Sequence, residues 1–300
     1  MKTFYSNGKL LITGEYVVLD GAKALALPTK FGQDLTVENG FGKAIHWKSF
    51  DADGRLWFED RIPFESIRQK SESQNPISQT LIEILHAAYI LNPAFLETDG
   101  FLVTTKLTFS RFWGLGTSST LINNIAQWIG IDAFLLLKNS FGGSGYDIAC
   151  AQNDHPILYQ IGDKNPIIEP VDFNPEFASK LYFVYLNKKQ SSKSAIQSYY
   201  QKRKTITDTV AAVDHLTKQI LKTETAAAFA TVLEKHESIL SKTLELPTVK
   251  SALFPDFKGT VKSLGGWGGD FVFVVSEENP TAYFKEKGYE TVIPYSQMIL

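Results

Sequence analysis

The chain contains a single cysteine, Cys150, among its 300 residues. No disulfide can therefore form within it, which is typical of proteins from reducing compartments. The neighbours of Cys150 are small or apolar, so we expect a buried thiol rather than a nucleophile. The sequence also lacks any apolar run near the ~20 residues that a membrane-spanning helix needs. Its first residues do not read as a secretory signal, and together these absences favour a cytoplasmic protein.

An excess of charge of either sign is also missing. The chain has 30 Lys and Arg against 32 Asp and Glu, a net charge of -2. Its basic clusters, 188–189 and 202–204, are short, so we expect neither nucleic acid nor a membrane surface as partner. The five histidines do not cluster, and we expect no transition-metal site. The oligomeric state is left open.

The apolar pattern predicts an α+β fold with two layers. A proline-rich segment over 165–175 indicates a linker, which suggests domains 1–175 and 176–300. The sequence 51–54 has part of a calcium-loop pattern, but a hairpin turn is favoured. Helices are predicted over 76–91, 120–129, 194–222, 225–244 and 281–286, and strands over 9–13, 22–27, 31–37, 44–50, 55–58, 101–109, 156–161, 181–186, 261–264, 271–275 and 290–293.

The most informative segment precedes the helix predicted at 120–129. It reads Gly114-Leu115-Gly116-Thr117-Ser118-Ser119. Its glycines allow the backbone to approach a ligand closely, and the start of a helix attracts phosphate through unpaired N–H groups and a partial positive charge. The alternative is an ordinary helix cap made by serine or threonine. Taken alone, the segment does not distinguish the two.

Several common enzyme motifs fail at specific positions. No P-loop pattern exists, and Ser119 stands where a dinucleotide fingerprint needs its third glycine. His236 and Glu237 begin a zinc-protease motif, but Leu240 replaces the second histidine. Gly142-Gly143-Ser144-Gly145 begins a hydrolase elbow, but Tyr146 replaces its last glycine.

Three further segments accompany the one at Gly114, and their order along the chain is informative. The first runs from Ser6 to Tyr16 and contains Gly8-Lys9-Leu10-Leu11 and Gly14-Glu15-Tyr16. The next runs from Gly142 to Ala149, and the last runs from Lys262 to Asp270 around Gly265-Gly266-Trp267-Gly268-Gly269. In this order the four segments resemble the GHMP kinases, a family of ATP-dependent small-molecule kinases, over nearly the whole chain. The run from Gly145 to Ala149 is similar to a bacterial subgroup named after those five letters.

The resemblance implies a two-domain fold, with a left-handed βαβ crossover in the N-terminal ATP-binding domain and a ferredoxin-like C-terminal domain. It also implies ATP and Mg²⁺ as cofactors, and a mevalonate-like alcohol or phosphate as the small-molecule substrate. Mevalonate diphosphate decarboxylase, which shares this fold, is an alternative. Another is a non-catalytic nucleotide-binding protein, because a metal-binding glutamate of some relatives is missing and Trp267 interrupts the last glycine loop.

The resemblance assigns roles to individual residues. Asp147 matches the catalytic aspartate and would accept or orient the substrate hydroxyl, and Lys9 matches a lysine expected beside it. An acid at a helix start and a solvated lysine are the structural alternatives. Ser118 matches a Mg²⁺ ligand, and Glu15 either contacts substrate or braces its loop. ATP is expected on Gly114, Leu115, Gly116, Thr117, Ser118 and Ser119, and substrate on Ser144, Gly145, Gly265, Gly266 and Gly268. The segment 190–193 either contacts substrate or caps a helix.

Overall fold

A computed structural model describes residues 1–190, 192–202 and 206–300, with the backbone alone for 192–194 and 202. The chain forms two compact units. The first unit comprises residues 1–8, 31–111 and 115–152, and the second unit comprises residues 9–30, 112–114 and 153–300. Residues 153–175 therefore group with the C-terminal part of the chain, whereas the proline-rich segment suggested a division after residue 175.

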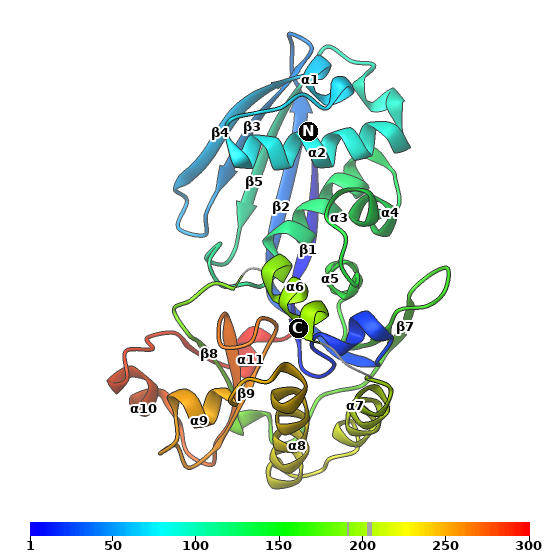
Figure 1. Ribbon diagram of the computed structural model, residues 1–300. Helices are drawn as coiled ribbons and strands as arrows, with labels where there is room; N and C mark the ends of the chain where they lie inside the picture. Colours follow the sequence, from blue (N-terminus) through cyan, green and yellow to red (C-terminus); the bar gives the residue numbers. More distant parts are fainter. Residues whose placement is uncertain (191, 203–205) are drawn as a thin grey trace. The chain divides into compact units, whose positions relative to one another are not determined.

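A sheet and the helices on one of its faces form the first unit (Figure 1). Its strands follow the order β4-β3-β5-β2, and β1 pairs with β2. Strands β3 and β5 run parallel, so the chain crosses over between them through β4 and three helices, one of them a short 3-10 helix. The strands are β1 (Lys2–Leu11), β2 (Ala24–Asn39), β3 (Ala44–Phe50), β4 (Leu56–Pro63) and β5 (Phe101–Leu107). The hairpin turn predicted before β4 is confirmed, since Asp51 N–H donates to the carbonyl of Arg55 at 3.0 Å.

Strand β2 joins two segments that the sequence pattern predicted as separate strands. Its residues 24–26 pair with β6 (Ile157–Gln160) and its residues 33–39 pair with β5. Pro28 falls between these two ladders, so its missing N–H group removes a hydrogen bond from neither of them. At Gly32 an added Cβ would lie 2.3 Å from the carbonyl oxygen of Ser6, so the approach of β1 requires glycine there.

The helices of the first unit bury their apolar faces against this sheet. The helix α2 has the predicted bounds, because Asn75 caps its start and Pro76 occupies its first position. Trp47, Ile84 and Ile125 are at most 1% exposed in the shared core, and each such burial contributes about 1.5–3 kcal/mol. The helices are α1 (Phe64–Gln69), α2 (Pro76–Leu91), η2 (Pro93–Leu96), α3 (Thr117–Ile129), α4 (Ala133–Ser140) and α5 (Tyr146–Ala151).

An antiparallel sheet of order β11-β8-β10-β9 organises the second unit. With helices between β8 and β9 and between β10 and β11, the chain follows the βαββαβ path of a ferredoxin-like domain. The strands are β6 (Ile157–Gln160), β7 (Ile167–Pro170), β8 (Leu181–Tyr185), β9 (Thr260–Ser263), β10 (Phe271–Val275) and β11 (Val292–Pro294). Strand β7 lies inside the segment predicted as a linker.

Helices cover both faces of this second sheet. Phe254 of the α9 end and Phe284 of α10 pack on the face that carries Val272 and Val274. Phe229 of α8 packs on the opposite face, with its ring 5.8 Å from that of Phe273. The helices are η1 (Val17–Asp20), η3 (Ala178–Lys180), α6 (Ser192–Lys202), α7 (Thr207–Ile220), α8 (Ala226–Leu244), α9 (Val249–Leu253), α10 (Thr281–Glu286) and α11 (Tyr295–Met298).

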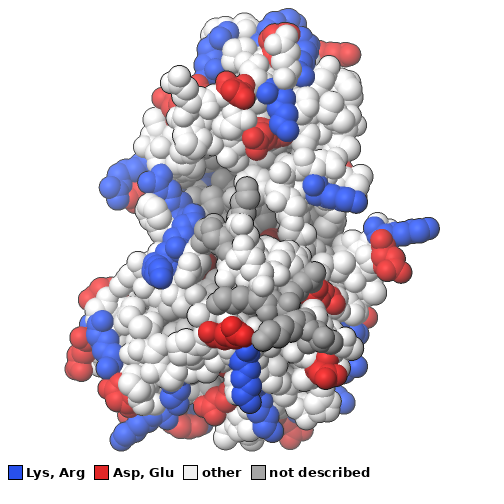
Figure 2. Space-filling model, in the orientation of Figure 1, with Lys and Arg blue, Asp and Glu red and all other residues white. Residues whose placement is uncertain are grey.

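Charged side chains of both signs are intermingled over the face of the molecule seen in Figure 2. Within the described residues, no helix combines the length and the apolar character needed to cross a bilayer.

Candidate functional site

The helix α3 begins at Thr117, three residues before the predicted start, so the hydroxyl residues form its first turn. Its cap is Gly116, with φ 97°, and no side chain caps the helix. Ser119 Oγ instead donates to the carbonyl of Gly116 at 2.9 Å. The serine or threonine cap that was the alternative interpretation is therefore absent. Since the first turn holds no acid and Ser118 is exposed, this helix start suits an anion.

Packing restricts the position of Gly114. Its φ is 70°, and an added Cβ would lie 2.3 Å from Cγ of Asp270 within the second unit. The carboxylate of Asp270 also accepts the N–H of Gln190 at 3.1 Å. Burial raises the pKa of Asp270, and the charges of Lys9 and Lys189 oppose this rise. Asp270, for which no role was predicted, therefore lies against the glycine-rich segment.

Asp147 lies in the first turn of α5, whose cap is Gly145 with φ 90°. A carboxylate in the first turn of a helix is favoured by the helix dipole, so this position is compatible with the catalytic interpretation and with its structural alternative. The helix α5 packs on α3, and Gln152 at its end donates to Oδ1 of Asn123 at 2.9 Å. Ser118 and Asp147 thus lie in the first turns of two helices that contact each other in the first unit. Lys9 belongs to the second unit, and its pairing with Asp147 stays a prediction.

The last glycine loop is the hairpin connection between the antiparallel strands β9 and β10. Gly265 and Gly268 have φ of 62° and 71°, and Gly266 lies against Gln190, where an added Cβ would be 2.4 Å from Cβ of that residue. Trp267 anchors the loop. Its N–H donates to the hydroxyl oxygen of Tyr16 at 2.8 Å and its indole N–H donates to the carbonyl of Pro247 at 2.9 Å.

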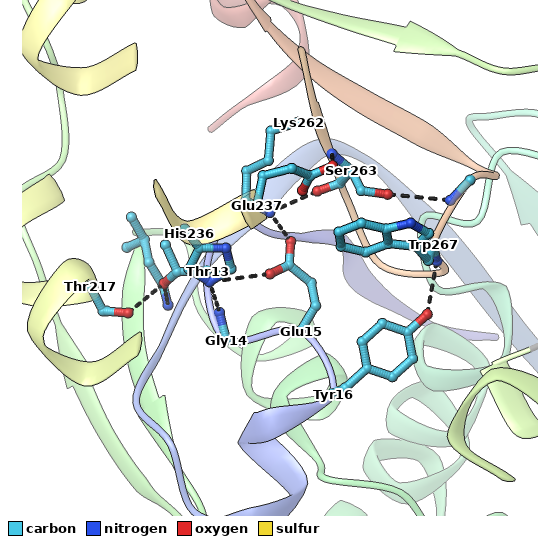
Figure 3. A network of polar contacts seen from close by, with 12 residues as sticks. Thr13, Gly14, Glu15, Tyr16, Thr217, His236, Glu237, Lys262, Ser263 and Trp267 are labelled. Atoms are coloured by element: carbon cyan, nitrogen blue, oxygen red, sulfur yellow. Dashed lines mark hydrogen bonds and ion pairs between the residues drawn. The ribbon is translucent and has the colours of Figure 1, made fainter. Parts of the chain in front are cut away.

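Glu15 is buried, with 2% exposure. Its carboxylate contacts the ammonium of Lys262 inside the second unit (Figure 3). Burial raises the pKa of Glu15 to about 7, and the charge of Lys262 opposes the rise. Of the two roles predicted for Glu15, this environment favours bracing of the loop over contact with a substrate.

A cavity of about 220 Å³ lies beside Trp267 in the second unit. The hydroxyl of Tyr199 donates to Asp20 at 2.5 Å, and Gln190 donates to the carbonyl of Trp267 at 3.0 Å. The polar ends of Tyr199 and Gln190 are therefore hydrogen-bonded within the protein. The aromatic rings and the leucine side chains supply the apolar part of the cavity wall. The lining residues are Tyr16, Gln190, Ala195, Ser198, Tyr199, Leu244, Leu246 and Trp267.

The segment 190–193, for which substrate contact or helix capping was predicted, is described only in part. Gln190 contacts the last glycine loop. Ser191 and the side chains of Ser192 and Lys193 lie outside the described residues.

Sequence reasoning missed several residues around these loops. Lys262 and Asp270 stand at the two ends of the last of the four segments, but no role was predicted for either. A lysine within an apolar strand is a signal that could have singled out Lys262. His236 and Glu237 were noticed only as an incomplete zinc motif, and both are buried next to Glu15. Within the described residues, no group of three or more His, Cys, Asp or Glu side chains is arranged to hold a metal ion.

No family model and no curated protein matches the sequence. Solved structures do match it. The chain resembles a mevalonate kinase with a TM-score of 0.67 and 15% identity over 97% of both chains. It resembles a Streptococcus pneumoniae phosphomevalonate kinase bound to phosphomevalonate and AMPPNP with a TM-score of 0.69 and 17% identity over 96% of both chains. For a Lactococcus lactis galactokinase the TM-score is 0.65 and the identity 13%, over 95% of this chain and 88% of that one.

These similarities extend over almost all of the chain in each case, although sequence identity is low. The glycine-rich segments, the ferredoxin-like sheet and the matching structures agree on one architecture. The resemblance stated from the sequence is confirmed, and the chain has the two-domain α+β fold of the GHMP kinases.

Proposed function

We propose that this protein is an ATP-dependent kinase that transfers the terminal phosphoryl group to the alcohol or phosphate of a small polar acid, with mevalonate or phosphomevalonate as the acceptor. The observation that carries the proposal is the start of α3. It has a glycine cap, no capping side chain and no acid in its first turn, in a fold shared with several kinases. Such a helix start binds phosphate through N–H groups and the helix dipole.

The triphosphate of ATP would lie along Gly114, Leu115, Gly116, Thr117, Ser118 and Ser119. The residues present also fit a magnesium ion, since Ser118 offers an exposed hydroxyl at this helix start and Mg²⁺ commonly keeps few protein ligands beside phosphates and waters. When bound, the ion would neutralise phosphate charge. The role of the chain is to fix the donor phosphates and exclude alternative positions.

Asp147 would accept or orient the proton of the acceptor hydroxyl, a role that its half-buried place at the start of α5 allows. Lys9 would screen the charge of the moving phosphoryl group. Ser144 and Gly145, which lead into α5, would contribute acceptor contacts, as would Gly265, Gly266 and Gly268. For Glu15 we propose the bracing role instead, because its carboxylate is directed to Lys262.

The cavity beside Trp267 supports an acceptor with an apolar portion. Its walls include Tyr16, Tyr199, Leu244 and Trp267. A sugar ring carries hydroxyls on every side and needs several free donors and acceptors, whereas a branched aliphatic acid can place its hydrocarbon portion against such walls. This favours a mevalonate-like acceptor over the sugars named for other proteins of this fold.

A phosphorylation assay over a panel of acceptors tests the proposal. The panel contains mevalonate, phosphomevalonate, mevalonate diphosphate, galactose and a heptose phosphate. We expect ATP turnover with one of the first two. Turnover with sugars alone would refute the acceptor class, carbon dioxide release from mevalonate diphosphate would indicate a decarboxylase, and ATP binding without any turnover would indicate a non-catalytic protein.

The variant Asp147→Asn tests the catalytic residue. Loss of general acid–base function costs about 10²–10⁴-fold in rate, and calorimetry should still detect ATP binding. Asp132→Asn is the matched control, because Asp132 caps α4 by accepting the N–H of Phe134 at 2.7 Å and asparagine caps helices equally well. Unchanged turnover in Asp147→Asn would remove that residue from the mechanism.

A further inference from the structure

A completely buried lysine stands where strand β9 leads into the last glycine loop. Lys262 is 0% exposed. Its ammonium contacts Oε1 of Glu15 and donates to the carbonyl of Ser263 at 2.7 Å (Figure 3). An ammonium taken out of water is costly unless an opposite charge and hydrogen bonds replace the water. Glu15 is its direct counter-ion.

A second carboxyl group belongs to the same cluster. Glu237 of α8 is 3% exposed and accepts the N–H of Ser263 at 3.2 Å. The charge of Glu237 raises the pKa of Glu15, and the charge of Lys262 lowers the pKa of both carboxyl groups. In the described part of the chain, Oε2 of Glu15 and Oε2 of Glu237 each lack a hydrogen-bond partner.

The histidine in the cluster adds no positive charge. Nε2 of His236 accepts the N–H of Gly14 at 3.0 Å, which places the ring proton on Nδ1. Burial lowers the pKa of His236 well below its ordinary value, and the charge of Lys262 acts in the same direction. The same Nε2 lies 3.6 Å from Oε2 of Glu15, so an ionised Glu15 would face a lone pair there.

The charges that face the cluster therefore do not balance without a proton. The charge of one ammonium, on Lys262, acts on two buried carboxyl groups, on Glu15 and Glu237. Asp270 acts on Tyr16 from the last glycine loop and has Lys9 and Lys189 as its own cations. Glu234 of α8 accepts the hydroxyl of Thr260 at 2.7 Å. With both carboxyl groups ionised, the buried cluster would hold an uncompensated negative charge, so one of them retains a proton.

The cluster adjoins the contacts that hold the first and last glycine loops together. Glu15 precedes Tyr16, a non-glycine residue with φ 65°, whose hydroxyl accepts the N–H of Trp267. Ser263, which bonds both Lys262 and Glu237 through its backbone, also accepts the N–H of Gly268 on its Oγ at 3.3 Å. A change of charge in the cluster therefore acts directly on residues that position both loops.

We propose that Lys262, Glu15 and Glu237 are positioning residues that share one proton, and that release of this proton loosens the contact of Tyr16 with Trp267 beside the acceptor cavity. The effect on catalysis rests on the proposed kinase function, whereas the shared proton does not. Either carboxyl group alone would neutralise Lys262. Removing one of them should therefore remove the titration near neutral pH, and removing both should leave the lysine buried without a counter-ion.

The first test measures thermal stability of the full chain against pH, and it needs no substrate. The folded protein holds the shared proton more tightly than the unfolded protein, since the pKa of Glu15 rises from 4.5 to about 7 on folding. The stability that this proton contributes should therefore be fully present below pH 4.5 and be lost as the pH rises through about 7. Glu15→Gln and Glu237→Gln should each abolish this decline, which is measured by comparing the stability of each variant with that of the unmodified chain at every pH.

The double variant Glu15→Gln/Glu237→Gln provides the non-additive test. It should lose more stability than the two single variants together, because only it leaves Lys262 unpaired. If the double variant does not fold, the pH dependence of stability of the two single variants still tests the proposal. Single variants that keep the full decline, or a double variant that is merely additive, would overturn the proposal. The control Glu234→Gln should keep the decline, since its hydrogen bond to Thr260 survives the change.

The second test is the acceptor KM of the kinase against pH. We expect the KM for mevalonate to rise severalfold as the shared proton is lost near pH 7, with a smaller change in kcat, and to become flat in Glu15→Gln. A flat profile in the unmodified chain would refute the effect on loop position. Absence of turnover with every acceptor would instead refute the proposed function and leave the stability test standing.

Discussion

We predict that replacing Gly114 by alanine lowers the free energy of unfolding through two separate effects. The first cost is backbone strain, since Gly114 has φ 70° and an L-residue in the left-handed region loses about 1–2 kcal/mol. The second is a collision, because the new Cβ would lie 2.3 Å from Cγ of Asp270 and 2.5 Å from its Oδ1. Forcing an extra methyl group into a packed site costs about 1–3 kcal/mol. We therefore expect Gly114→Ala to lose about 2–5 kcal/mol of unfolding free energy.

Gly288→Ala is the matched control for the backbone term. Gly288 also lies in the second unit and has φ 86°, but an added Cβ there would meet nothing within 4 Å. It should lose only the strain of about 1–2 kcal/mol. Urea unfolding followed by circular dichroism measures both variants, with the midpoint compared at equal slope.

A second substitution at Asp270 tests whether the collision is the cause. Asp270→Ser shortens the side chain and should recover about 1–3 kcal/mol when combined with Gly114→Ala. Asp270→Asn keeps the size and should recover none of the steric cost. The reasoning is refuted if Gly114→Ala loses no more than Gly288→Ala, or if the serine and asparagine backgrounds behave alike.

Two further predictions concern buried hydrogen bonds. Asn124 is 0% exposed, accepts the hydroxyl of Ser6 at 2.7 Å and donates to a carbonyl of β2 at 2.8 Å. Asn124→Ala should therefore lose about 2–4 kcal/mol of unfolding free energy, measured by urea unfolding. A loss below about 1 kcal/mol would contradict the importance of this network. Tyr16→Phe removes the acceptor of the Trp267 N–H and should raise the acceptor KM severalfold without changing ATP affinity in calorimetry, whereas an equal loss of both would contradict a local effect on the last glycine loop.

The local rules of the sequence determined most elements of the fold. The helix over 76–91 was predicted to the residue because a proline start, an asparagine cap and a regular apolar face agree there. The strand over 271–275 was likewise obtained from a run of buried β-branched and aromatic residues. The ordered glycine-rich segments indicated the kinase fold, because close backbone approach and positive φ restrict those positions to glycine.

Tertiary structure decided what these rules could not. Pro28 and Gly32 are breakers in sequence, but β2 runs through both because its two halves pair with different partners. The start of α3 lies three residues earlier than its apolar pattern suggested, since a glycine cap needs no side-chain signal. Helix boundaries depend on such caps more than on periodicity.

The same division holds for the candidate site. Gly114, Ser118 and Asp147 could be proposed from the sequence because their motifs are local. The cluster of Glu15 and Lys262 joins residues 247 positions apart, and only folding brings them into one buried space. Whether a carboxyl group contacts solvent, a ligand or an ammonium depends on burial and on the charges packed around it. Sequence therefore supplied the residue types, and tertiary packing determined which of them share a charge and a proton.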